Sequence, residues 1–200
     1  TESYDLVIVG SGGAGLSAAV TAAEAGDHKV VILEKMPVIG GNTLRCASAF
    51  NAADPERQKR LPMTKTLKDA VVKAISEKPV NAEHAKLMAD VKAKYEAYLK
   101  SGSKTLFDCP EWHALQTYNG GDKVGHIPLI RTYSENVLDT LHWMQKHGTP
   151  VLDRVSQGAG ALWQRTHQVD APAGTGLVEP LLKSARKDGV KIITGMRAQE

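Results

Sequence analysis

The stretch DLVIVGSGGAGLSAA (residues 5–19) decides the fold of this chain. Residues 4–9 are mostly apolar and β-branched, a pattern typical of a strand buried on both faces of a parallel sheet. Residues 14–25 are rich in alanine and precede Gly26, which predicts a helix with a glycine stop. KVVIL (29–33) predicts a second buried strand. The order strand, helix, strand indicates an α/β, doubly wound fold with a parallel sheet.

The glycine-rich segment GSGGAG (10–15) fits the pattern G-x-G-x-x-G between this strand and this helix. Gly10 would make the tight turn, Gly12 would let the backbone approach a pyrophosphate, and Gly15 would let the helix pack closely on the strand. The start of the helix adds unpaired N–H groups for the phosphates. Glu34 ends the second strand, where an acid accepts hydrogen bonds from a ribose 2′-OH. These features predict a dinucleotide site, and the pattern itself suits FAD and NAD equally.

The middle of the chain predicts surface helices added to this core. Residues 36–60 and 101–128 are interrupted by glycine and proline and predict loops. The lysine-rich segment 65–100 predicts two surface helices with a break near residues 79–81. The apolar positions of the second helix are Leu87, Val91, Tyr95, Tyr98 and Leu99.

The last third of the chain returns to an α/β pattern. The predicted elements are a helix over 128–147, strands over 151–155 and 161–166, a helix over 177–188 and a buried strand over 190–194. The apolar side of the first of these helices carries Ile130, Tyr133, Val137, Leu141 and Met144. The segment GTG (174–176) predicts either a plain turn or a helix start with Thr175 as the N-cap.

Composition excludes several classes of function. The 25 Lys+Arg against 22 Asp+Glu give a formal net charge of +3, and the basic residues are scattered, which argues against nucleic-acid binding. No segment is long and apolar enough for a membrane span, and we expect no signal peptide, so the compartment stays open. Cys46 and Cys109 have no metal-ligand spacing, and we expect two free thiols, with a disulfide as the alternative. The histidines show no paired ligand spacing, so we expect no metal site.

Several motifs, in order, resemble the flavocytochrome c fumarate reductases and their urocanate-reductase-like relatives, within the succinate dehydrogenase/fumarate reductase flavoprotein superfamily. The motifs are VIVGSGGAGLSAA (7–19), ILEK (32–35), GGNT (40–43), FNAADPERQK (50–59), QTYNGGD (116–122), LHWMQKHG (141–148), GALWQRTH (160–167) and GTG (174–176). The resemblance weakens over residues 61–108. It implies that residues 1–200 are the N-terminal part of a Rossmann-like FAD-binding domain with a helical insertion at about 64–105. The capping domain and the C-terminal half of the FAD domain have no match in this chain.

The resemblance also favours FAD over NAD. The residues that it places against FAD are Gly10, Ser11, Gly12, Gly13, Ala14, Gly15, Glu34, Lys35, Gly41, Asn42, Thr43, Ala47 and Ser48. Membrane-bound members of the superfamily attach FAD through a histidine at the position of Asn42. Because asparagine has no nucleophilic ring nitrogen, we expect non-covalent FAD. Soluble fumarate reductases tend to have paired glycines where this chain has Ser48 and Ala49, and a Cβ there changes the floor of the pocket.

The activity implied by the resemblance is that of an FAD-dependent oxidoreductase, which reduces an activated C=C bond of a small unsaturated carboxylate, fumarate-like or urocanate-like, by hydride transfer from flavin N5. A flavin dehydrogenase of the same superfamily, and a cofactor-binding fragment that is inactive without its missing segment, remain alternatives. The electron donor would be an FMN or haem domain or protein. The proton-donating arginine of the family has no match here, so Arg165 and His167 are the nearest catalytic candidates. Their alternative roles are an ion pair for Arg165 and a backbone hydrogen bond for His167.

Overall fold

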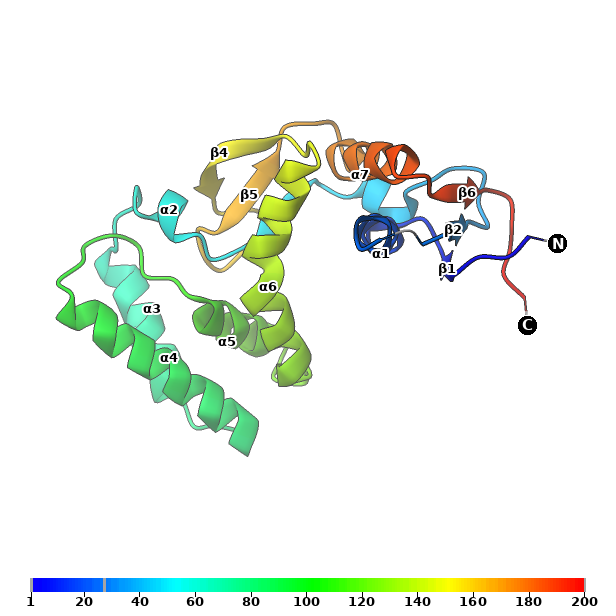
Figure 1. Cartoon of the computed structure of the whole chain (residues 1–200). Helices are drawn as coiled ribbons and strands as arrows, with labels where there is room; N and C mark the ends of the chain where they lie inside the picture. Colours follow the sequence, from blue (N-terminus) through cyan, green and yellow to red (C-terminus); the bar gives the residue numbers. More distant parts are fainter. Residues whose placement is uncertain (1, 27, 200) are drawn as a thin grey trace. The chain divides into compact units, whose positions relative to one another are not determined.

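The computed structural model describes residues 2–26 and 28–199 (Figure 1). The chain forms two compact units. The first unit is drawn from Thr1–Ala49, His142–Leu152 and Val169–Glu200, and the second from Phe50–Leu141 and Asp153–Gln168. The insertion expected at about 64–105 therefore falls inside the second unit.

The first unit contains the predicted parallel sheet. Its strands are β1 (Leu6–Val9), β2 (Val30–Leu33) and β6 (Lys191–Ile193), in the order β1-β2-β6. Both pairings are parallel, with Leu6 opposite Val30 and Val31 opposite Lys191. The crossover helix α1 (Gly13–Glu24) packs against α7 (Thr175–Lys187). Strand, glycine loop, helix and strand thus follow one another as the sequence predicts.

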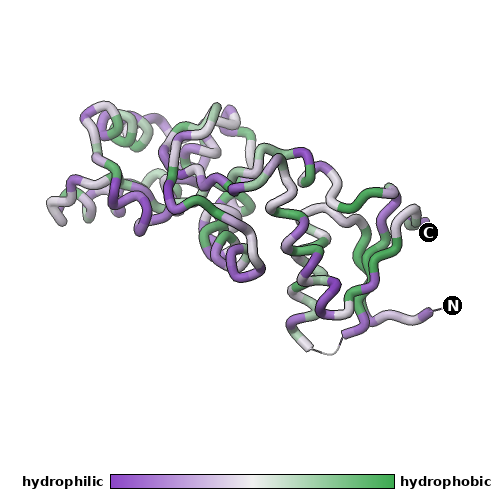
Figure 2. The backbone as a smooth tube through the Cα atoms, turned by 90° about the horizontal axis from the view of Figure 1, so that it is seen from above, coloured by the Kyte–Doolittle hydropathy of each residue, from purple (hydrophilic) through white to green (hydrophobic). Residues whose placement is uncertain are grey.

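Burial differs among the three strands. Val30, Val31 and Ile32 in β2 are at most 2% exposed, because β2 is paired on both edges. The prediction of buried strands is wrong for β1 and β6, where Val9 is 68% exposed and Lys191 is also exposed. Both are outer strands of the described sheet, so each is paired along one edge only. Figure 2 shows how hydrophobic residues nevertheless run along this sheet near the two termini.

The stretch 36–60, predicted as a loop, contains three short elements. They are the 3-10 helix η1 (Gly41–Arg45), strand β3 (Ala49–Asn51) and helix α2 (Pro55–Gln58). The side chain of Asp54 caps α2 by accepting hydrogen bonds from the N–H groups of Glu56 and Arg57. The prediction was wrong here because caps and glycine turns stabilise elements too short to show periodicity.

The second unit contains the two predicted surface helices, α3 (Lys65–Ser76) and α4 (Ala82–Lys100). The side chains of Thr64 and Asn81 cap them, so the break near residues 79–81 is confirmed. Helix α4 buries Leu87, Val91 and Tyr95 as predicted. Leu99 is 52% exposed instead, because the buried face ends before the last turn of the helix.

Helix α5 (Pro110–Gly120) contradicts the loop predicted over residues 101–128. Residues 112–116 are all buried, and the helix packs against α4. Trp112 meets Trp163 edge-on, with ring centroids 5.3 Å apart. Five consecutive buried residues cover more than one turn of a helix, so the contrast between its faces is weak and periodicity could not reveal it. Pro110 at the first turn was the available signal.

The remaining elements mostly follow the prediction. Helix α6 (Ile127–Lys146) and strand β4 (Val151–Ser156) are confirmed, although Tyr133 on α6 is 47% exposed. The strand predicted over 161–166 is wrong: this segment turns, and β5 (Thr166–Val169) follows it. The indole N–H of Trp163 donates to Phe107 O at 3.0 Å, which holds the turn against the core. Strands β3, β5 and β4 form the second sheet in that order.

The N-cap of α7 is Gly174 and not Thr175. The Thr175 hydroxyl donates to Pro172 O at 2.6 Å, so it does not accept from the helix. A Cβ on Gly174 would lie 1.6 Å from Thr43 O, which leaves no room for another residue type. The start of α7 therefore packs closely against η1. Gly174 N also donates a hydrogen bond to Leu44 O of η1, at 3.0 Å.

Other findings concern membranes, thiols and metals. Among the helices that the structure describes, none has the length and apolar character of a membrane span. Cys46 and Cys109 are free thiols. Within residues 2–26 and 28–199, no three His, Cys, Asp or Glu side chains gather in a way that could hold a metal ion.

Candidate functional site

A groove of about 600 Å³ lies in the first unit, where the chain leaves β1 and β2. Residues from three separate stretches line it, and those after β6 complete it with Met196, Arg197 and Ala198. Six residues of the predicted FAD set also line it: Gly10, Gly12, Glu34, Lys35, Gly41 and Asn42. The structure therefore brings together the glycine loop, the acid after β2 and the GGNT segment, which are separate in sequence.

The glycine loop has the geometry that a phosphate-binding turn requires. Gly10 has φ of 97°, a conformation that side chains disfavour. A Cβ on Gly15 would lie 2.0 Å from Gly10 O, so only glycine lets α1 begin here. Gly12 is the N-cap of α1 in extended conformation and has no side-chain cap. The first N–H groups of α1 lack helical carbonyl partners and carry the positive end of the helix dipole.

Glu34 is buried at the edge of the groove and is tied to the glycine loop. Its Oε2 accepts from the N–H of Ser11 at 2.8 Å and from the Ser11 hydroxyl at 2.7 Å, and its Oε1 accepts from the N–H of Met36 at 2.8 Å. The bond from Met36, followed by those from Ser11, lowers the pKa of Glu34 below its usual value. An ionised carboxylate offers about four acceptor sites, two on each oxygen. Ser11 uses both sites on Oε2 and Met36 uses one on Oε1, so the second site on Oε1 is available to a ligand.

The GGNT segment is fastened to the same loop. Gly40 N donates to the Ser11 hydroxyl at 3.2 Å, and Gly13 N donates to Thr43 Oγ1 at 3.0 Å. Thr43 thus supplies the cap that Gly12 cannot, a role that sequence analysis missed because 30 residues separate the partners. Asn42 is exposed and lines the groove.

The residues of this groove fit a dinucleotide. A Cβ placed on Gly12 would meet only Gly40 O, at 4.0 Å, so the backbone is open to a close ligand. The positive end of the α1 dipole and the cationic side chains of Lys35 and Arg197 suit phosphates, and Glu34 suits a ribose hydroxyl.

Ala47 and Ser48, predicted to run beside the isoalloxazine ring, follow η1. Ala47 is exposed, whereas Ser48 is buried and has φ of 53°. Val169 N donates to Ser48 O at 2.9 Å, which holds the backbone in this left-handed conformation. The contact of both residues with a flavin ring stays a prediction.

Arg165 makes the expected ion pair, in the second unit. Its Nε and Nη2 donate to the two carboxylate oxygens of Asp108, at 3.0 and 2.7 Å. Both side chains are at most 5% exposed. Gln58 Nε2 also donates to Asp108, at 2.6 Å. Burial favours the neutral acid and raises the pKa of Asp108, although the Arg165 charge opposes this. The pair joins the end of the turn at 161–165 to the segment before α5.

His167 makes the expected backbone hydrogen bond and a second contact. Its Nδ1 lies 3.1 Å from Arg165 O, and its Nε2 lies 3.0 Å from Asp54 Oδ2, with the imidazole fully buried. Burial opposes ionisation of Asp54, but bonds from His167 and Arg57 outweigh it and lower the pKa of Asp54 to about 2. Nδ1 thus lies against the backbone just before β5, and Nε2 holds β5 to the N-cap residue of α2.

Comparison with known proteins shows which proteins the chain is similar to. Residues 5–100 match the family described as FAD binding domain. The chain is 35% identical over its whole length to the NADH:acrylate oxidoreductase of Vibrio harveyi, but spans only 21% of that protein. It is 40% identical over 84 residues to the urocanate reductase of Eggerthella lenta, which is 42% of this chain and 13% of that one.

A solved structure has the same fold. The open conformation of a flavocytochrome c3 fumarate reductase superposes with a TM-score of 0.67 at 21% identity, and covers 98% of this chain and 27% of that one. The groove and the glycine loop suit a dinucleotide, and the matching family identifies that dinucleotide as FAD. Residues 5–100 therefore belong to an FAD binding domain, and the chain is similar to the acrylate and urocanate reductases named above.

Proposed function

We propose that this chain is the FAD-holding part of an oxidoreductase that reduces an activated C=C bond of a small unsaturated carboxylate. The observation that carries the proposal is the 35% identity to an NADH:acrylate oxidoreductase along the whole chain. The name of the urocanate reductase relative points to the same reaction on a larger unsaturated acid. Acrylate, fumarate and urocanate are thus the substrates to test first.

The chain's own residues hold the adenine dinucleotide end of the cofactor in this proposal. The pyrophosphate binds beside the glycine loop at the start of α1, where the helix dipole is positive, and the free acceptor site of Glu34 binds the ribose. Lys35 adds positive charge beside the phosphates. When bound, FAD supplies hydride transfer at its ring nitrogen N5.

The flavin is held without a covalent bond, because Asn42 has no nucleophilic ring nitrogen to attach it. Ala47 and Ser48 run beside the flavin ring in this proposal. Arg165 and His167 act as positioning residues, since each is tied to a buried carboxylate. The proton donor belongs to a segment of the resembled family that has no counterpart in this chain. The electron donor is an FMN or haem group on another domain or protein.

The test is anaerobic turnover by the purified protein that contains this chain. Reduced methyl viologen is the electron donor, and its oxidation is followed spectrally with acrylate, fumarate or urocanate present. We expect oxidation that depends on one of these acids and stops in a variant that lacks FAD. Turnover only in the reverse direction, with an oxidised dye and a saturated substrate, would support a dehydrogenase instead. Bound FAD without turnover in either direction would identify a cofactor-binding module.

The mode of flavin attachment is tested on the same sample by acid precipitation. We expect all of the flavin in the supernatant and a colourless pellet. Yellow colour that stays in the washed pellet would contradict the role given to Asn42.

A further inference from the structure

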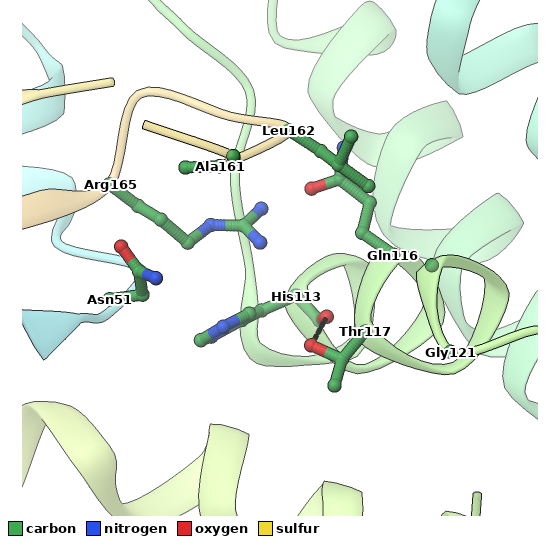
Figure 3. Close-up of a pocket in the computed structure, with 10 residues that line it drawn as sticks. Asn51, His113, Gln116, Thr117, Gly121, Ala161, Leu162 and Arg165 are labelled. Atoms are coloured by element: carbon green, nitrogen blue, oxygen red, sulfur yellow. Dashed lines mark hydrogen bonds between the residues drawn. The ribbon is translucent and has the colours of Figure 1, made fainter. Parts of the chain in front are cut away.

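The second unit contains a polar pocket beside α5, open to solvent on one side, which we call the α5 cavity (Figure 3). It measures about 340 Å³, near the lower end of the range for small-molecule sites. The side chains that decide its chemistry are Asn51, His113, Gln116 and Arg165, and Leu162 stands at its edge. In Figure 3 the Arg165 guanidinium and the His113 ring face the same space.

Two side chains that line this cavity each have a buried polar atom without a partner. His113 is 5% exposed and Gln116 is 9% exposed, yet His113 Nδ1 and Gln116 Oε1 make no hydrogen bond within the described chain. An unsatisfied buried polar group costs about 1–3 kcal/mol. Two such groups on successive turns of one helix, beside an open cavity, indicate a place for a hydrogen-bonding ligand.

The cavity also has one fixed donor. Nε and Nη2 of Arg165 are both used by Asp108, which leaves Nη1 for the cavity. The charge of this guanidinium is therefore already compensated by a carboxylate. The backbone beneath His113 is firm, because the Thr117 hydroxyl donates to His113 O at 2.8 Å.

No second positive charge is available for an anionic ligand. Burial, and then the charge of Arg165, lowers the pKa of His113 to about 3, so the imidazole is neutral near pH 7. A carboxylate ligand would bring a second negative charge next to Asp108 with no cation left to balance it. A neutral ligand avoids this cost and can satisfy both unpartnered atoms.

We propose that the α5 cavity binds a small neutral molecule or substituent that carries a carbonyl oxygen beside an N–H, such as a primary carboxamide. The carbonyl oxygen accepts from Arg165 Nη1. The amide N–H groups donate to Gln116 Oε1 and to His113 Nδ1. The assignment uses none of the residues of the dinucleotide groove, and shares only Arg165 with the proposed reductase.

The test compares benzamide with benzoate, which have nearly the same shape and differ in charge. Their binding to the purified protein at pH 7 is measured by saturation-transfer NMR and calorimetric titration. We expect benzamide to bind with Kd of about 1 mM or tighter and benzoate to bind at least about tenfold more weakly. Equal or tighter binding of benzoate would overturn the proposal, and so would the absence of benzamide binding.

Two variants locate the binding. Leu162→Trp fills the edge of the cavity from a side chain that is 60% exposed, so folding is unaffected, and benzamide binding should be lost. Leu129→Trp is the matched control, since Leu129 is 68% exposed and does not line the cavity. Gln116→Leu removes the acceptor and should weaken benzamide by about tenfold. Unchanged affinity in both Leu162→Trp and Gln116→Leu would show that benzamide binds elsewhere and would refute the site.

Discussion

The carboxylate of Glu34 accepts two hydrogen bonds from one residue, Ser11, through its N–H and its hydroxyl, at 2.8 and 2.7 Å. The Ser11 hydroxyl in turn accepts from Gly40 N, so one acid holds the glycine loop and the GGNT segment together. Glu34 thus shapes the groove besides offering an acceptor to the ribose.

Glu34→Gln should weaken FAD binding by at least about tenfold, because an amide cannot replace an anionic acceptor for two donors of Ser11. The measurement is a flavin fluorescence titration of the apoprotein. Glu56→Gln, an exposed acid outside the groove, is the matched control and should bind FAD normally. A Kd within twofold of wild type for Glu34→Gln would remove Glu34 from the binding site.

Ser48→Gly should be more stable than Ser48→Ala by about 1 kcal/mol. Both variants lose the hydroxyl, so their difference isolates the cost of a Cβ at φ of 53°. Urea unfolding followed by circular dichroism gives the two free energies. Equal stabilities would mean that the backbone at Ser48 is not strained in solution.

Arg165→Met should lower the free energy of unfolding by about 3–5 kcal/mol, because it leaves the buried Asp108 carboxylate without its cation. The double variant Arg165→Met/Asp108→Leu should recover a large part of this loss, since it removes both charges. A double variant that is as unstable as the sum of the two single variants would contradict a pairwise role. Thermal and urea unfolding report all three values.

The stability contributed by Asp54 should depend on pH. Its folded-state pKa of about 2 is below the ordinary value of 3.8, so the contribution is complete above about pH 4 and is lost as pH falls towards 2. At neutral pH it amounts to about 2.5 kcal/mol. The difference in unfolding free energy between wild type and Asp54→Asn should therefore shrink between pH 5 and pH 3. A difference that stays constant would refute the lowered pKa, and the exposed Asp139→Asn serves as control.

The elements predicted correctly are those whose signal is local. The β1-α1-β2 unit follows from adjacent apolar runs and from the spacing of its glycines, and α3 and α4 follow from a lysine-rich composition and from apolar positions at helical spacing. Six of the residues that line the groove were among those predicted, because a glycine loop and an acid at fixed spacing have one common use.

The missed elements depend on tertiary contacts. Helix α5 buries Trp112 and the four residues after it, more than a full turn, so the contrast between its faces is too weak to set a period. The strand predicted at 161–166 begins with the apolar residues Ala161, Leu162 and Trp163, but this segment turns. The polar residues Thr166 and His167 of β5 are buried because they find partners in distant segments. Arg165 and Asp108 are 57 residues apart, and no pattern in the sequence connects them.

Strand β6 pairs with β2 although the whole second unit lies between them along the chain, with Val31 opposite Lys191. Contacts between residues so far apart in sequence carry a large loop-closure entropy cost. The residues just after β6, among them Arg197, complete the dinucleotide groove. The lining of the groove is therefore complete only while β6 is paired with β2, so retention of FAD should depend on contacts between the two ends of the first unit.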